Sequence, residues 1–350
     1  MRLPSWAIKV FWALFGLLAF IIALEILKDG ARGYGRAIVG LFQIAGPWNA
    51  LGFGWLLAYV FLSGSPVAAI SVTFFASGTV NAIEAFTMIT GSRLGASFIV
   101  LFVGFVYYLR GHQRSASISI GVLALLTTAA IYLPAMALGW WLLSSNLLPT
   151  LSLATESPLS SVLDRLVDPI MAGIHLLGLP GWALFFVGIG MLLGAFSLLD
   201  RALPEMHAER SSFQRIGTLV YRPIAMFLLG CAVTSVTMSV SVSLSILVPL
   251  SARGMVRREN TLPYIMGANI TTFIDTLVAA LISGGPAAFM IVLVEMTSVA
   301  AFSLIVLCFC YRQFASGVLR LQEAIIENNW RLGVFLGIML LVPVLLLLVQ

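Results

Sequence analysis

Charged residues are scarce in this chain. Asp, Glu, Lys and Arg make up 9% of its 350 residues, whereas they make up roughly 25% of an average soluble domain. Hydrophobic residues make up 60%, and the mean hydropathy is +1.05. A water-soluble fold could not cover so much apolar surface. We therefore expect a multi-pass integral protein of the cell membrane.

Cysteine and histidine are also rare, with three residues of each type. The cysteines lie in apolar runs and the histidines are far apart, so neither set forms a recognisable metal or disulfide framework. The sequence has no Gly-rich nucleotide loop, no nucleophile elbow and no paired His-Glu motif. We expect no enzymatic activity, no bound metal and no cofactor other than a coupling ion.

Basic residues outnumber acidic ones, which gives a net charge of +5. They are scattered singly among hydrophobic segments, so we expect solvated loops beside anionic lipid headgroups and no binding of nucleic acid. The distribution of Lys and Arg over these loops leaves the relative orientation of the two halves of the chain open.

Five continuous apolar runs are long enough to cross a bilayer, whose hydrocarbon core of about 30 Å needs about 20 helical residues. They show no alternation with a period of two, which predicts helices and not barrel strands. The runs lie near residues 6–27, 118–143, 182–199, 286–310 and 333–349. The first is longer than a typical signal-peptide core and no small-residue cleavage site follows it, so we expect it to be retained.

Two segments that lie 176 residues apart carry matching serines and glycines. Aligned without a gap, nine of the 29 positions from Ser63 to Gly91 are identical to those from Ser239 to Gly267. Composition alone supplies matched Val, Ile and Ala, so the serines and glycines are the informative part. In membrane transporters, segments broken by Gly, Ser and Pro in corresponding halves point to the binding site.

Short apolar pieces surround both segments. They predict helices at residues 47–62, 67–75 and 82–90, and at 223–238, 244–250 and 262–266, with further breaks at Gly91 and Gly267. Broken backbone at membrane depth is tolerated only where protein or a polar cavity satisfies its amide groups. The prediction is an all-α integral membrane protein of two structural repeats, with broken helices and re-entrant helical hairpins that meet near the centre.

The predicted organisation has four parts. They are a first transmembrane repeat at residues 1–145, an inter-repeat linker with an interfacial segment at 146–180, a second transmembrane repeat at 181–311, and an interfacial segment with a C-terminal transmembrane helix at 312–350. The charged pieces at 163–168 and 318–331 are the two segments expected to lie along the membrane surface.

This arrangement resembles the type II sodium/phosphate cotransporter family, whose repeats each carry a Gln-Ser-Ser-Ser motif followed by a Gly-Ala-Asn-Ile-Gly-Thr-Thr-like motif. The strongest match is Gly267-Ala268-Asn269-Ile270, and the resemblance covers roughly residues 48–100 and 223–285. It implies inverted repeats, serine-rich hairpin tips that bind phosphate and sodium, and alternating access. Leu62 and Met238 stand where the family has glutamine, Thr271 where it usually has glycine, and Arg93 where it has asparagine.

Hydroxyl groups and free backbone amides at helix breaks can together hold an anion. The predicted substrate-binding residues are Ser63, Ser65, Arg93, Ser239, Ser241, Gly91 and Gly267. The predicted cation-binding residues are Asn269, Thr271, Thr272 and Asp275. The structural alternative is that the small residues permit close helix packing and that each serine bonds to its own helix backbone.

Arg93 is the most informative single residue. An arginine at membrane depth costs about 3 to more than roughly 10 kcal/mol, so it should face a cavity or a partner. We expect it to bind the substrate anion or to take the place of a lost sodium ion. The structural alternatives are an ion pair with Glu84, Asp275 or Glu295, or a position from which the side chain snorkels to the membrane interface.

Two acidic residues lie in apolar surroundings. Asp275 could coordinate Na⁺, accept a proton or pair with an arginine. Glu295 is flanked by apolar residues on both sides, and a role in coupling competes there with a buried ion pair. Glu84 is expected to have a structural role, beside a helix cap at Asn81.

These features predict a secondary active transporter of an inorganic anion, in the first place sodium-coupled phosphate symport by alternating access. One alternative is a proton-coupled or uncoupled carrier of another anion. Another is a non-transporting membrane protein that has kept the fold. The expected partners are inorganic phosphate or a similar anion, Na⁺ and the lipid bilayer, and the sequence leaves a homodimer open.

Overall fold

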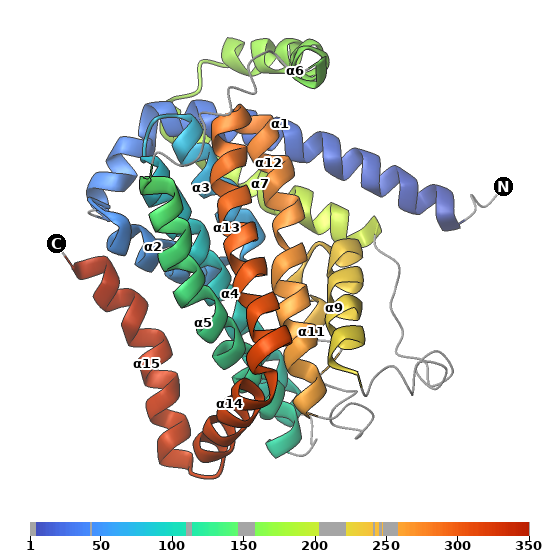
Figure 1. Cartoon of the computed structure of the whole chain (residues 1–350). Helices are drawn as coiled ribbons and strands as arrows, with labels where there is room; N and C mark the ends of the chain where they lie inside the picture. The colour runs from blue at the N-terminus through green and yellow to red at the C-terminus, as the bar shows by residue number, and fades with distance from the viewer. Residues whose placement is uncertain are drawn as a thin grey trace.

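The computed structural model describes residues 5–42, 44–109, 114–145, 158–202, 222–240, 242–244, 247 and 258–349. All regular structure in these ranges is helical (Figure 1). The principal helices are α1 (Ser5–Leu41), α2 (Pro47–Phe61), α3 (Ser65–Ala76), α4 (Ala82–Leu109), α5 (Arg114–Ser144), α6 (Pro158–Leu176), α7 (Gly181–Ala202), α9 (Pro223–Thr237), α11 (Arg258–Thr271), α12 (Phe273–Ser283), α13 (Gly285–Ile305), α14 (Tyr311–Ile326) and α15 (Asn329–Leu348).

Seven helical stretches in the described part of the chain are long and apolar enough to cross a bilayer. Five of them coincide with the predicted apolar runs: Ile8–Leu41, Ile118–Ser144, Gly181–Leu199, Gly285–Ile326 and Asn329–Leu348. The other two, Ala82–Phe102 and Glu259–Ser283, run through the glycine motifs that sequence patterns mark as breaks. The chain is therefore an all-α, multi-pass membrane protein.

The predicted breaks at Gly91 and Gly267 are wrong. Helix α4 continues without interruption past Gly91, and α11 continues past Gly267 to Thr271. A Cβ atom on Gly91 would overlap the carbonyl oxygen of Leu51, and one on Gly267 would overlap that of Phe227. These glycines let α4 approach α2, and α11 approach α9, at backbone distance.

The same two contacts contain a second pair of glycines. A Cβ atom on Gly54 of α2 would overlap the carbonyl oxygen of Met88, and one on Gly230 of α9 would overlap that of Tyr264. Each helix of the pair thus contributes at least one glycine to the crossing. The two crossings use positions with the same separation of 176 residues as the serine segments.

The breaks predicted at the serines are present. Helices α2 and α9 are both 15 residues long and both begin with proline. They end at Leu62 and Met238, whose φ angles of 49° and 47° are left-handed. Such a conformation turns the chain out of the helix at a cost that residues other than glycine rarely accept. Helix α3 begins soon after the first break, whereas most of the predicted helix at 244–250 lies outside the described residues.

Helices α1 and α7 pack along each other. A Cβ atom on Gly30 would overlap the backbone of Phe185, and one on Gly188 would contact the backbone of Leu27 at 2.8 Å. The N-terminal part of α1 extends beyond the bundle, where its apolar side chains are exposed (Figure 1). A large core cluster joins α1 and α7 to α2, α3, α4, α5, α12 and α13.

The two segments predicted to lie along the membrane surface fall at opposite ends of the bundle. Residues 163–168 belong to α6, and residues 318–331 belong to α14 and the start of α15 (Figure 1). Their position against lipid stays a prediction. The predicted part boundaries at 145 and 181 fall at the end of α5 and the start of α7.

Candidate functional site

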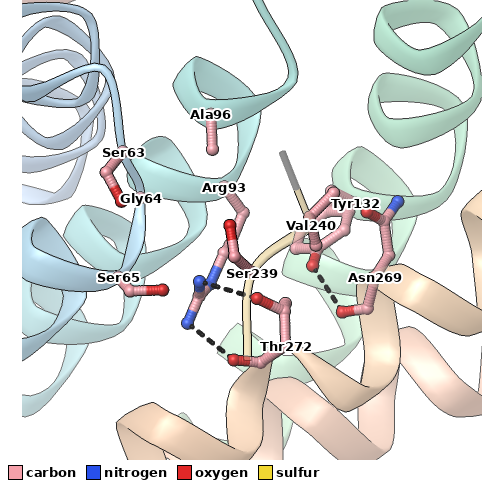
Figure 2. Close-up of a pocket in the computed structure, with 10 residues that line it drawn as sticks. All are labelled: Ser63, Gly64, Ser65, Arg93, Ala96, Tyr132, Ser239, Val240, Asn269 and Thr272. Atoms are coloured by element: carbon pink, nitrogen blue, oxygen red, sulfur yellow. Dashed lines mark hydrogen bonds between the residues drawn. The ribbon is translucent and has the colours of Figure 1, made fainter. Parts of the chain in front are cut away.

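The two serine-containing breaks face one small cavity (Figure 2). About 10 Å³ of it is open to the centre of a water molecule, which is about the room for one bound water. The lining residues are Ser63, Gly64, Ser65, Arg93, Ala96, Tyr132, Ser239, Val240, Asn269 and Thr272. Six of the predicted site residues are therefore brought together from both segments; we call this space the polar chamber.

Ser63 and Ser65 reach the chamber because the chain turns sharply between α2 and α3. Ser63 follows the left-handed Leu62, and Ser65 lies in the first turn of α3. Between them, Gly64 packs on α4: a Cβ atom there would lie 2.9 Å from the carbonyl oxygen of Ser92. The first turn of α3, with its free amide groups, is thereby fixed beside the chamber.

Ser239 enters from the break after α9. Its hydroxyl oxygen accepts a hydrogen bond from the amide of Val242 at 3.3 Å, and its carbonyl oxygen accepts one from the Thr237 hydroxyl at 3.2 Å. The Ser239 hydroxyl proton remains available as a donor. The predicted partner Ser241 lies outside the described residues.

Arg93 projects from α4 toward the start of α12. Its guanidinium donates to the Thr272 hydroxyl at 3.2 Å and to the Thr276 hydroxyl, and lies 3.5 Å from an Asp275 carboxylate oxygen. It also stacks over the Phe273 ring, 4.8 Å from the centroid. Figure 2 shows the guanidinium between Ser65 and Thr272. Of the three acidic partners considered, Asp275 is the one it contacts.

One nitrogen of this arginine is unused. Arg93 is only 4% exposed, and its Nε atom has no hydrogen-bond partner among the described residues. A buried donor without a partner costs free energy. A ligand oxygen in the chamber would relieve that cost.

Glu84 has the structural role that the sequence predicts. The Asn81 side chain accepts hydrogen bonds from the amides of Ile83 and Glu84 at 3.0 and 2.9 Å. The Glu84 carboxylate in turn accepts from the Asn81 amide at 2.8 Å. This reciprocal capping box fixes the start of α4, the helix that carries Arg93.

The four predicted cation ligands do not surround one point. Asn269 and Thr272 line the polar chamber, whereas Asp275 lines a neighbouring cavity. The Thr271 hydroxyl bonds to the Gly267 carbonyl of its own helix at 3.3 Å and faces neither space. The Thr271 hydroxyl is turned away from the other three because helical geometry points Thr271 and Thr272 in different directions, and a cation site at these residues stays a prediction.

Asn269 ties α11 to α5. Its side-chain amide donates to the Thr128 hydroxyl at 3.0 Å, and its carbonyl oxygen accepts a hydrogen bond from Tyr132 at 3.0 Å (Figure 2). The side-chain oxygen of Asn269 is left for other partners. The Gly-Ala-Asn-Ile motif thus combines a packing glycine with an asparagine that borders the chamber.

Glu295 of α13 is buried at 2% exposure. Neither carboxylate oxygen has a partner of regular hydrogen-bond geometry among the described residues, although the Thr90 hydroxyl, which donates to the Phe86 carbonyl, lies near the carboxylate. It borders neither cavity, but Arg93 and Tyr132 are ionisable groups near it. A carboxyl group so placed is expensive to keep ionised without partners.

A second, larger cavity continues from the polar chamber on the side of α1 and α7. About 300 Å³ of it is open to the centre of a water molecule, and it shares Ser63, Ser65 and Ser239 with the polar chamber. Its other lining residues are Ala13, Leu17, Phe20, Phe196, Leu199, Thr237, Met238, Asp275 and Val278. Most of these are apolar, so we call it the apolar chamber.

Sequence reasoning missed two polar residues of the site. Thr276 follows Thr272 by four positions, so helical spacing predicts that both face the same way. Tyr132 stands in an apolar run just before Pro134, and nothing in the local pattern distinguishes it. Conversely, Gly91 and Gly267, predicted to bind substrate, line neither chamber and serve helix packing.

No protein-family model, curated protein or solved structure matches this chain. The resemblance to the type II sodium/phosphate cotransporters therefore stays a prediction from the motifs.

Proposed function

We propose that the protein is a secondary active transporter of an inorganic anion, in the first place phosphate with sodium as the coupling ion. One observation carries the proposal: two serine-containing helix breaks, far apart in sequence, meet an arginine at a single buried chamber. Packing alone does not require an arginine there, because placing it at membrane depth is expensive.

We also propose that the two halves are structural repeats with inverted orientation, and that each break is the tip of a re-entrant hairpin. The equal lengths of α2 and α9, their left-handed ends and their glycine contacts with α4 and α11 support this. All of these features recur at the separation of 176 residues. Such pairs of broken helices occur at the binding sites of many transporters.

Anion binding would use donors from both breaks. The hydroxyls of Ser63, Ser65 and Ser239 and the free Nε of Arg93 are the available donors. Asp275 balances the charge of Arg93 locally, so hydrogen bonds and not net charge would select the ligand. The polar chamber is too small for phosphate, and movement of one hairpin tip relative to the other would open it.

Uptake into proteoliposomes tests the proposal. The purified protein would be reconstituted and supplied with phosphate, sulfate or chloride, with Na⁺ in the medium or replaced by choline at constant ionic strength. We expect phosphate uptake that depends on Na⁺ and on the protein. If none of the anions is taken up under any condition, the chain is not a transporter.

Removing one serine hydroxyl from each break should weaken the same binding event. Ser63→Ala and Ser239→Ala are each expected to raise the KM for phosphate by about tenfold, because a hydrogen bond to a charged group contributes about 1.5–3 kcal/mol. The control is Ser316→Ala, an exposed serine of α14. Initial uptake rates at several phosphate concentrations measure the effect, and unchanged KM values in both variants would remove the serines from the site.

Proton coupling is the second candidate function, and Glu295 favours it. A buried carboxyl group near Arg93, with the Thr90 hydroxyl as its one nearby hydrogen-bonding group among the described residues, is suited to bind and release a proton during a transport cycle. Under this candidate, uptake persists without Na⁺ and is driven by an inward proton gradient.

Replacing Glu295 separates the two candidates. Glu295→Gln keeps the volume but cannot exchange a proton, so a proton-coupled carrier is expected to lose its response to an imposed pH gradient and keep anion exchange. The control is Glu327→Gln, in the exposed turn between α14 and α15. If Glu295→Gln retains full Na⁺-driven uptake, Glu295 has no role in coupling.

A further inference from the structure

The apolar chamber has the form of a binding site with two chemically different ends. Leu17 and Phe20 of α1 and Phe196 and Leu199 of α7 form apolar walls. Its polar lining consists of the three serines that it shares with the polar chamber, together with Thr237 and Asp275, whose carboxylate is paired with Arg93. Ligand sites of this volume are commonly apolar with a few polar groups that fix orientation.

The chamber borders the lipid-facing surface. Leu17, Met238 and Val278 line it and are also exposed. Leu17 belongs to a candidate membrane span, as does Val278. A molecule dissolved in the bilayer could therefore enter the chamber sideways with its apolar part among α1 and α7.

The polar end favours a small acidic group. Arg93 lines the polar chamber together with the shared serines, and its Nε is a buried donor without a partner among the described residues. A carboxylate or phosphate oxygen can accept from this nitrogen and from the serine hydroxyls at the same time. A purely apolar chain would leave all of these donors without partners.

We propose that the two chambers together bind a single-chain amphiphile with a small acidic head, the head at the shared serines and the chain against the apolar side chains of α1 and α7 that line the apolar chamber. The ligand class is that of fatty carboxylates and monoalkyl phosphates. This deepens the proposed transport function by adding an apolar part to the anion, and it rests on that function for the role of the serines as anion ligands.

Photochemical labelling tests the proposal. The full-length protein in phosphatidylcholine nanodiscs would be exposed to palmitic acid that carries a diazirine on its chain, and labelled residues would be mapped by mass spectrometry. We expect labelling of Leu17, Phe196 and Leu199 above that of Leu340 and Leu341, which face outward on α15. Unlabelled dodecyl phosphate should compete, whereas dodecanol at the same concentration should not.

Filling the chamber provides the matched variant. Ala13→Trp is expected to lower labelling of the chamber by more than about fivefold, because it occupies the space that the chain needs. Ala13→Leu should give a smaller decrease, which guards against a tryptophan variant that fails to fold. Ala37→Trp, at an exposed alanine of the same helix, should leave labelling unchanged.

Three results would overturn the proposal: labelling no greater than on α15, labelling unaffected by both Ala13 variants, or competition by dodecanol equal to that by dodecyl phosphate. Phosphate uptake by the same preparation keeps this test separate from the proposed function. Uptake without amphiphile labelling rejects the amphiphile and retains the anion carrier. Labelling without uptake of any tested anion rejects the anion carrier and retains the amphiphile site.

Discussion

Replacing Arg93 by methionine is expected to lower the free energy of unfolding by about 3–5 kcal/mol, because it leaves Asp275 buried without its positive partner. Asp275→Leu should be similarly destabilising, since it isolates the arginine. The double variant Arg93→Met/Asp275→Leu removes both charges and should recover most of the loss. Unfolding in a denaturing-detergent titration measures all three.

The double variant also separates stability from function. It should be folded and yet show no anion uptake, because the Arg93 guanidinium no longer lines the polar chamber. Arg32→Met is the control: its ion pair with Asp29 is mostly solvent-exposed and should contribute about 1 kcal/mol or less. Full uptake by a stable double variant would reduce Arg93 to a structural partner of Asp275.

Adding a single methyl group at the helix crossings should be as damaging. Gly91→Ala and Gly267→Ala are each expected to lower the free energy of unfolding by about 3 kcal/mol or more, because the new Cβ meets a rigid backbone carbonyl and not a flexible side chain. Gly317→Ala is the control, since no atom lies within 4 Å of its added Cβ. It should be neutral or stabilising by about 0.5–1 kcal/mol.

The comparison between the two halves is the sharper part of this prediction. If the crossings are equivalent, Gly54→Ala and Gly230→Ala should also form a matched pair, with losses within about 1 kcal/mol of each other. The same unfolding titration reads all four variants. A large loss in one half and none in the other would contradict the equivalence of the two crossings.

The first break was predictable because its cause is local. Ser, Gly and Pro close together at residues 63–66 disfavour continuation of a helix, and the apolar length before them is too short to cross a bilayer. Both signals are present in a few neighbouring residues. The second break, at residues 238–241, has neither Gly nor Pro and was predicted from its alignment with the first. The positions of the left-handed Leu62 and Met238 agree with this reading.

The role of Gly91 and Gly267 was not predictable from the local sequence. A glycine can end a helix, or it can make room for a neighbouring helix to pack closely. The local sequence looks the same in both cases, and only the packing partner distinguishes the two roles. Here that partner is α2 for one and α9 for the other. Sequence repetition showed that these positions mattered, and the tertiary contacts showed why.

The identity of the acidic residue that contacts Arg93 was likewise not predictable from the local sequence, because it depends on helix packing. The expense of a buried arginine predicted that it would face a cavity or an acidic residue, and both are present. Which of three acidic residues it would contact depends on how α4 lies against α12. Tyr132 reaches the chamber in the same way, by the packing of α5 on α11.

Protection of two introduced cysteines by phosphate tests most directly that the two breaks form one anion site. Ser63→Cys and Ser239→Cys would each be made in a variant whose three native cysteines are serine, and modified with a small methanethiosulfonate reagent. At ten times its Kd, phosphate should slow modification of both by about tenfold, and leave Ser316→Cys unaffected. Protection of only one of the two, or of neither, would contradict a shared site.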